Sequence, residues 1–241
     1  MNNIKAILFD SGRVLNYPST GHWFITPNFW QFVDKTKFYD IDKSKLSNAF
    51  RKADDYIMSH KLIITKDEEL QHFIKFYEII AENLPELQLK RESIHSIAND
   101  LVFNADKYTF YDDALNAITE FHKKYKLAIV SDAWPSLLDV YDKNGLTNYF
   151  DSIVISSLIG TTKPDPKMYL TALKELNIEP QEAVFVDDSL KNCSEAVEVG
   201  INTLLLCRDK RAYITNKIKA IGKKYKVINS LNELENYINL K

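Results

Sequence analysis

Five short hydrophobic runs are spaced along the chain, and most of them end in polar residues and lead into a helical pattern. The runs are KAILFD (5–10), LAIVSD (127–132), SIVISS (152–157), AVFVDD (183–188) and NTLLL (202–206). Unbroken runs of Ile, Val, Leu and Phe are typical of strands that are covered on both faces. Because they alternate with helices, they predict an α/β fold with a Rossmann-like, doubly wound parallel sheet.

Residues 16–105 show a helical period instead. Thr65 and Glu68 are spaced as a capping box, and the run that follows places apolar residues on one helical face. These are Leu70, Phe73, Ile74, Tyr77 and Ala81, and similar faces run from Leu46 to Ile57 and from Ile94 to Leu101. We therefore expect a helical domain over 16–105, inserted into an α/β core domain formed by 1–15 and 106–241.

Polar residues stand where the predicted strands end. In open parallel sheets, ligands bind outside the carboxyl ends of the strands. Taken singly, an aspartate at such a place is more often a turn former or a helix cap than a catalyst. Together these residues predict a single crevice, and they are Asp10, Ser131, Asp132, Asp187 and Asp188.

Composition and charge narrow the class of protein. The 241 residues carry a formal net charge of -2, with basic and acidic residues mixed along the chain, which predicts neither a nucleic acid nor a membrane as partner. No apolar run is long enough to span a bilayer, and MNNIKAILFD lacks the pattern of a signal peptide. Two cysteines, without metal-ligand spacing, are too few for a disulfide framework. We expect a cytoplasmic protein, and the oligomeric state stays open.

Four motifs follow one another in the chain: ILFDSGRVL, LAIVSDAWPS, GTTKPDPKMY and AVFVDDSLKN. In order and in their predicted elements they resemble the four motifs of the haloacid dehalogenase-like hydrolase superfamily. The resemblance covers nearly the whole chain and includes the subfamily's helical cap between the first and second motifs. It implies a phosphatase that acts on a small phosphorylated metabolite, with the cap domain selecting the substrate.

The resemblance also implies roles for the first and fourth motifs. Asp10 takes the position of the nucleophile, which attacks phosphorus and forms an aspartyl-phosphate. The family relieves the repulsion between carboxylate and phosphate with Mg²⁺, a cation that prefers oxygen ligands. The matching ligands are Asp10, the backbone carbonyl of Gly12 and Asp188, with Asp187 and Asn192 in an outer shell.

The second and third motifs match groups that hold the phosphate. Ser131 corresponds to a small hydroxyl that hydrogen-bonds a phosphate oxygen, and Lys163 to a lysine that offsets the nucleophile and the phosphoryl charge. Backbone amides at Ser11 and Gly12, together with Asp132, complete the implied substrate-binding set. The two prolines in GTTKPDP stiffen the lysine's segment, and Pro166 suits the first turn of a helix.

Gly12 and Arg13 depart from the family pattern. Most phosphatases of the superfamily carry an acid/base aspartate where this chain has Gly12, and glycine where it has Arg13. General acid/base catalysis is typically worth ~10²–10⁴-fold in rate.

Three interpretations stay open. The first is a phosphatase with altered acid/base chemistry, using a leaving group of low pKa or a proton from Asp132 or the cap. The second is a 2-haloacid dehalogenase-like enzyme, against which the Asp187–Asp188 pair counts because those relatives need no metal and lack it. The third is a slow or non-catalytic member that binds a phosphorylated ligand or a protein partner.

The segment after the first motif, NYPSTGHWFITPNFWQF, is rich in aromatic residues. One hypothesis is that His22, Trp23 or Arg13 touches the leaving group of the substrate. The simpler interpretation is that these aromatics pack the core of the helical domain, which is the commoner fate of large rings.

Overall fold

The computed structural model describes residues 4–239, and the chain divides into two compact units. The larger unit comprises 1–17, 110–133 and 145–241, and the smaller one 18–109 and 134–144. Residues 134–144 thus group with the helices, whereas we expected them in the core domain. The reason is that Trp134 packs against Phe24 and Phe73, with ring centroids 6.4 and 5.0 Å away.

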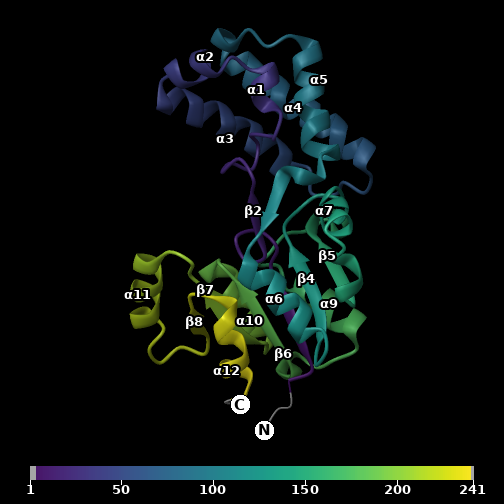
Figure 1. The fold of residues 1–241 in the computed structure, drawn as a ribbon, viewed down its shortest axis with the longest axis vertical. Helices are drawn as coiled ribbons and strands as arrows, with labels where there is room; N and C mark the ends of the chain where they lie inside the picture. Colours follow the sequence, from purple (N-terminus) through teal and green to yellow (C-terminus); the bar gives the residue numbers. More distant parts are fainter. Residues whose placement is uncertain (1–3, 240–241) are drawn as a thin grey trace. The chain divides into compact units, whose positions relative to one another are not determined.

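The larger unit is built on a six-stranded parallel sheet with the order β5-β4-β1-β6-β7-β8 (Figure 1). The strands are β1 (Ala6–Phe9), β4 (Lys126–Ser131), β5 (Ser152–Ile155), β6 (Ala183–Asp187), β7 (Asn202–Leu206) and β8 (Lys226–Ile228). The predicted parallel α/β fold is confirmed. Only β8 was not expected, because a run of three residues, KVI, carries too little pattern to stand out.

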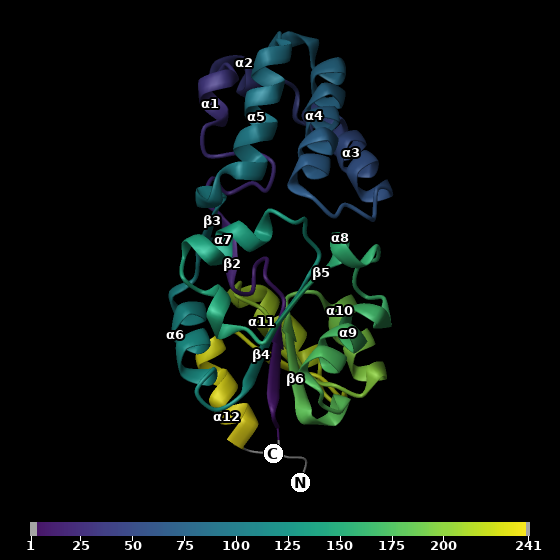
Figure 2. The ribbon, with the colours of Figure 1, turned by 90° about the vertical axis from the view of Figure 1, so that its right-hand side faces the viewer.

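Helices cover both faces of this sheet, with α6 and α12 on one side and α9 and α10 on the other (Figure 2). The helices of the larger unit are α6 (Asp112–Phe121), α8 (Ser156–Ile159), α9 (Pro166–Leu176), α10 (Leu190–Val199), α11 (Lys210–Lys219) and α12 (Leu234–Asn239). Ala6 and Leu8 of β1 pack with Met168 and Leu173 of α9, and the alternate residue Ile7 is also fully buried. Burial on both faces explains why the sequence of this strand is apolar without alternation.

The smaller unit is helical. Its helices are α1 (Phe29–Phe32), α2 (Lys35–Asp40), α3 (Lys43–Ser59), α4 (Lys66–Asn83), α5 (Arg91–Phe103) and α7 (Leu137–Lys143). The predicted capping box is present: Thr65 and Glu68 satisfy each other's backbone amides at the start of α4. Asp42 caps α3 by accepting hydrogen bonds from the amides of Ser44 and Lys45.

Aromatic residues fill the core of the helical unit. Phe29 is buried there, and Phe24, Trp30 and Phe32 pack against the same cluster. Most of the aromatics after the first motif therefore have a packing role. A two-stranded sheet joins β2 (Asn16–Pro18) to β3 (Tyr108–Phe110). Over the described residues, none of the helices combines the length and apolar character that crossing a membrane requires.

Candidate active site

Strand register brings the predicted carboxylates to one edge of the sheet. Phe9 of β1 lies opposite Ile129 of β4 and opposite Val186 of β6. Asp10 and Asp187 are the next residues along their strands, and the Asp10 amide donates to the Val186 carbonyl at 2.9 Å. Since parallel strands end at the same edge, both carboxylates lie at the same level.

Lys163 joins these two carboxylates. Its ammonium Nζ lies 2.6 Å from Asp10 Oδ1 and 2.7 Å from Asp187 Oδ2, and its side chain is only 1% exposed. Its backbone amide donates to Asp132 Oδ1 at 2.8 Å. The loop that carries Lys163 leads directly into α9, which begins at Pro166 as expected. The lysine is thus held at both its backbone and its ammonium group.

Burial and neighbouring charges act in opposite directions on the pKa values of Asp10 and Lys163. Burial raises the pKa of Asp10 to about 8, although the ammonium of Lys163 opposes this shift. Burial also disfavours the charged form of Lys163, yet the carboxylates of Asp10 and Asp187 raise its pKa overall. Desolvation raises the pKa values of Asp132 and Asp188 as well. A further cation beside these carboxylates would favour their charged forms.

Three carboxylates form a group that fits a divalent cation. Asp10, Asp187 and Asp188 each offer an oxygen, and these oxygens all lie within 4.8 Å of one another. Hard carboxylate oxygens are the donors that Mg²⁺ prefers. The residues present therefore fit the cation that the motifs imply.

Asn192 lies against Asp187. Its Nδ2 donates to both oxygens of Asp187, at 3.1 and 3.3 Å, and the amide of Ser189 donates to Asp187 Oδ1 at 2.7 Å. Asn192 lies in the first turn of α10, which begins at Leu190. Asn192 therefore orients the buried Asp187.

A tight turn follows Asp10. The Ser11 hydroxyl accepts a hydrogen bond from Asn16 Nδ2 at 2.8 Å, and the Ser11 carbonyl accepts from the amides of Leu15 and Asn16. Arg13, not Gly12, takes the left-handed conformation, with φ of 61°. The Arg13 guanidinium lies 3.7 Å from Asp188 Oδ2. The residue that replaces the family's usual glycine is thus an additional positive charge beside the carboxylate group.

Ser131 is buried at the end of β4, at 3% exposure. Among the residues that the structure describes, no hydrogen bond links its hydroxyl to Asp10 or Lys163. The structure therefore brings together the carboxylates, Lys163 and Asn192. Ser131 precedes Asp132, which accepts a hydrogen bond from the Lys163 amide.

Arg208 supports the site, although the sequence did not lead us to predict this. Its guanidinium donates to the carbonyls of Arg13 (3.2 Å) and Val14 (2.8 Å) and to both oxygens of Asp113 (2.9 and 3.2 Å). It also lies 3.6 Å from the ring centroid of Tyr111. Arg208 holds the turn after Asp10 from the end of β7. The sequence did contain an indication of this role, because Arg208 lies two residues after the predicted strand 202–206, and the other site residues also lie at strand ends.

The chain resembles known hydrolases in sequence and structure. The family model "Haloacid dehalogenase-like hydrolase" matches residues 55–206, a range that contains Ser131, Lys163 and the aspartate pair and begins after Asp10. A glyceraldehyde 3-phosphate phosphatase of Pyrococcus furiosus is 25% identical over 194 residues, which are 70% of this chain and 79% of that protein.

Two solved structures share the fold. A haloacid dehalogenase-like phosphatase from Thermococcus onnurineus has a TM-score of 0.63 at 25% identity and covers 98% of each chain. A 2-haloacid dehalogenase from Pseudomonas syringae has the same TM-score at 16% identity, covering 98% of this chain and 99% of that one. The fold is therefore common to phosphatases and dehalogenases, and only the site chemistry separates the two activities.

Proposed function

Because this chain belongs to the haloacid dehalogenase-like hydrolases, we propose that it is a Mg²⁺-dependent phosphohydrolase acting through Asp10 on a small phosphorylated metabolite. Membership confirms the resemblance that the four motifs indicated. The named activity of the Pyrococcus relative supports a phosphorylated carbohydrate as the class of substrate. We place the enzyme in the cytoplasm on the composition of the chain.

The observation that carries the proposal is the arrangement of charge around Asp10. Lys163 engages Asp10 Oδ1, and among the described residues no hydrogen bond reaches Asp10 Oδ2. One oxygen is therefore held in place while the other is left for attack. Asp187 and Asp188 lie beside it, in a group that fits Mg²⁺.

The reaction runs in two displacements. In the first, an oxygen of Asp10 forms a bond to phosphorus while the bond from phosphorus to the leaving oxygen breaks. In the second, water attacks phosphorus and passes a proton to the group that protonated the leaving oxygen, the bond between the Asp10 oxygen and phosphorus breaks, and Asp10 is regenerated with release of inorganic phosphate. Lys163 offsets the charge that develops on the phosphoryl oxygens. Bound Mg²⁺ would be held by Asp10, the Gly12 carbonyl and Asp188, and it supplies neutralisation of the phosphate charge.

Gly12 cannot transfer a proton, so the leaving oxygen must obtain one elsewhere. Asp132 is our candidate acid, because burial raises its pKa and so favours its protonated form. A leaving group of low pKa, such as an acyl carboxylate or an anomeric sugar oxygen, needs less protonation. We therefore expect acyl and anomeric phosphates to be better substrates than alkyl phosphates.

The test is phosphate release with and without Mg²⁺ from p-nitrophenyl phosphate, acetyl phosphate and a panel of sugar phosphates. Activity should require Mg²⁺, disappear in Asp10→Asn and persist in Asp40→Asn, a matched change at an exposed aspartate. Loss in both variants would point to damage of the protein rather than to a nucleophile.

Two other outcomes would replace the proposal. Metal-independent release of halide from 2-haloacids, lost in Asp10→Asn, would assign a dehalogenase. Thermal stabilisation by phosphorylated ligands without turnover on any substrate of the panel would assign a phospholigand-binding protein.

A further inference from the structure

The segment formed by α11 and the loop after it, residues 209–226, concentrates positive charge. It contains seven basic residues and one acidic residue, Asp209, for a formal charge of +6, whereas the whole chain carries -2. The rest of the chain therefore carries -8. The basic residues are Lys210, Arg211, Lys217, Lys219, Lys223, Lys224 and Lys226.

These charges are not compensated within the protein. Over residues 4–239, none of the seven basic side chains forms a salt bridge, whereas lysines elsewhere, such as Lys5, Lys66 and Lys143, are paired with carboxylates. The one carboxylate that acts on Lys217 from a neighbouring element is Glu233. Asp209 is engaged as the N-cap of α11. A positive potential is therefore directed at solvent.

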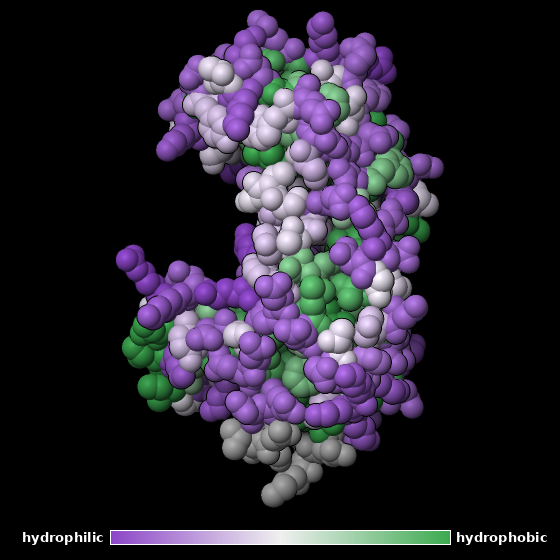
Figure 3. All heavy atoms as spheres, viewed as in Figure 1, coloured by the Kyte–Doolittle hydropathy of each residue, from purple (hydrophilic) through white to green (hydrophobic). Residues whose placement is uncertain are grey.

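Three isoleucines stand among these charges. Ile214, Ile218 and Ile221 are 51%, 65% and 80% exposed. Ile214 and Ile218 lie four residues apart on one side of α11. Ile221 lies in the turn that follows, where its amide donates to the Ile218 carbonyl at 3.2 Å. Figure 3 shows hydrophobic residues gathered beside hydrophilic ones at this end of the α/β unit. We call the three isoleucines and the seven basic residues the α11 face.

The isoleucines are not needed for packing within the unit. The opposite side of α11 already packs through Ala212 and Tyr213 onto a buried cluster that includes Leu205, Tyr225 and Val227. Exposing three aliphatic side chains in a row is costly unless something covers them, and contiguous apolar patches of this kind mark interaction sites.

We propose that the α11 face binds reversibly to the surface of a membrane that contains anionic phospholipid. Aliphatic side chains can enter the interface between headgroups and acyl chains while the flanking lysines remain with the anionic headgroups. A second copy of the chain is disfavoured, because a symmetric contact would bring two faces of the same charge together. Nucleic acid is disfavoured because the centre of the face is aliphatic and offers no ring on which a base could stack.

This proposal departs from our expectation that the chain has no membrane partner. That expectation relied on the mixture of charges over the whole chain, which conceals a local concentration within eighteen residues. It is also independent of the proposed phosphatase activity, because the α11 face contains none of the groups that we place in the site.

The test is co-sedimentation of the full chain with vesicles of phosphatidylcholine alone and of phosphatidylcholine mixed with phosphatidylserine. We expect binding to the mixed vesicles only, and weaker binding as salt is added. The triple variant Ile214→Ser, Ile218→Ser, Ile221→Ser should lower the partition coefficient about tenfold or more. Lys219→Glu, Lys223→Glu, Lys224→Glu should lower it at least about 100-fold, since each basic residue contributes about fivefold.

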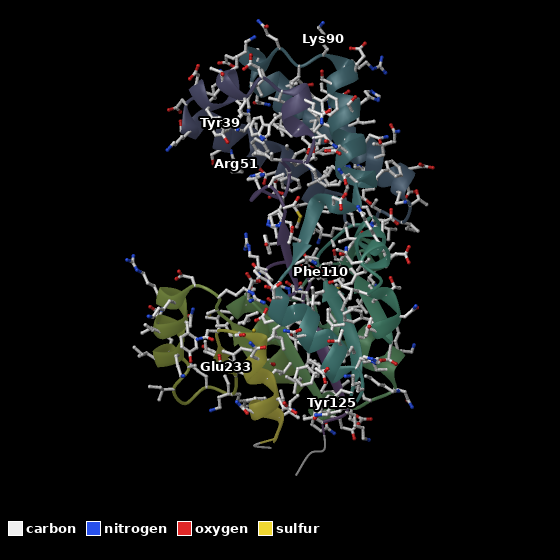
Figure 4. The ribbon with its side chains drawn as sticks, in the orientation of Figure 1. Tyr39, Arg51, Lys90, Phe110, Tyr125 and Glu233 are labelled. Atoms are coloured by element: carbon white, nitrogen blue, oxygen red, sulfur yellow. The ribbon has the colours of Figure 1, made fainter. Side chains whose placement is uncertain are left out.

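Matched controls use exposed residues elsewhere. Leu62→Ser with Ile64→Ser removes aliphatic side chains of similar exposure (59% and 55%) from the helical unit. Lys61→Glu, Lys90→Glu, Lys174→Glu makes the same charge change at exposed positions, of which Lys90 is labelled in Figure 4. The Leu62 and Ile64 control should leave vesicle binding unchanged, and the lysine control should weaken it only as far as the altered net charge of the whole chain requires. The rate of phosphate release should be the same in all these variants.

Several results would overturn the proposal. Equal binding to neutral vesicles, absence of binding to the mixed vesicles, or binding that both α11 variants retain would each do so. A mass in solution that doubles with concentration and is lost in the isoleucine variant would assign the face to self-association. Binding to duplex DNA in place of vesicles would assign it to nucleic acid.

Discussion

Replacing Lys163 with methionine removes the ammonium group that two buried carboxylates share. Each contact, at 2.6 and 2.7 Å, is worth about 6 kcal/mol of attraction at an effective dielectric constant of about 20, most of which is offset by the desolvation of the charges. Leaving a buried charge without its partner typically costs about 3–5 kcal/mol. We expect Lys163→Met to lose about this much of the free energy of unfolding near pH 8, together with phosphatase activity.

The loss should depend on pH. Without Lys163, the pKa of Asp10 in the folded state rises further above the value of 3.8 that describes an unperturbed aspartate. A carboxyl group whose folded pKa is raised stabilises the protein below its unfolded pKa, and this stabilisation is lost as the pH rises through the folded pKa. The deficit of the variant should therefore be small near pH 5 and grow toward pH 8.

Urea unfolding followed by far-UV circular dichroism measures this deficit. Tryptophan fluorescence would not follow the sheet, because Trp23, Trp30 and Trp134 all lie in the helical unit. Lys174→Met, at an exposed position of α9, is the matched control and should unfold like the wild type. Equal urea midpoints for the two variants at pH 8 would refute the view that Lys163 compensates the carboxylates.

Three further predictions address other parts of the molecule. Arg208→Lys should destabilise the protein by about 1.5–3 kcal/mol through loss of the paired bonds to Asp113 and the bonds to the turn, as measured by urea unfolding, while Arg211→Lys at an exposed position should be neutral. Gly12→Asp should raise hydrolysis of alkyl phosphates by ~10²-fold or more, because it restores an acid/base carboxyl group at a position whose backbone is not in the left-handed conformation. An unchanged rate in a folded variant would show that a missing acid is not the limitation. Burial lowers the pKa of Lys107 to about 8, so as the pH rises the folded state loses this proton before the unfolded state does. The free energy of unfolding should therefore rise between about pH 8 and pH 10 relative to that of Lys107→Met. Urea unfolding followed by tryptophan fluorescence measures this difference, and parallel pH profiles of the two proteins would contradict it.

The helical unit contains both features that the sequence predicts and contacts that it does not. The capping box at Thr65 and the apolar face of α4 could be read directly, because both depend on residues three to four positions apart. The burial of Glu69 and its hydrogen-bond partners could not be predicted in this way. Glu69 accepts hydrogen bonds from both the amide and the hydroxyl of Ser136, at 2.8 and 2.5 Å, and the same hydroxyl accepts from Lys107 at 2.5 Å. These partners are tens of residues away, and no local pattern distinguishes this glutamate from its solvated neighbours.

By itself, the sequence determined the parallel α/β fold, the inserted helices and the polar strand ends at Asp10 and Asp187, because periodicity and strand-end chemistry are local properties. Tertiary structure decided the rest. Strand register brought Asp10 beside Asp187, and the loop before α9 delivered Lys163 between them. The placement of Arg208 on the turn and the outward direction of the isoleucines of α11 were likewise decided by packing. Contacts between distant segments depend on how elements pack, which the spacing of residues along the chain does not specify.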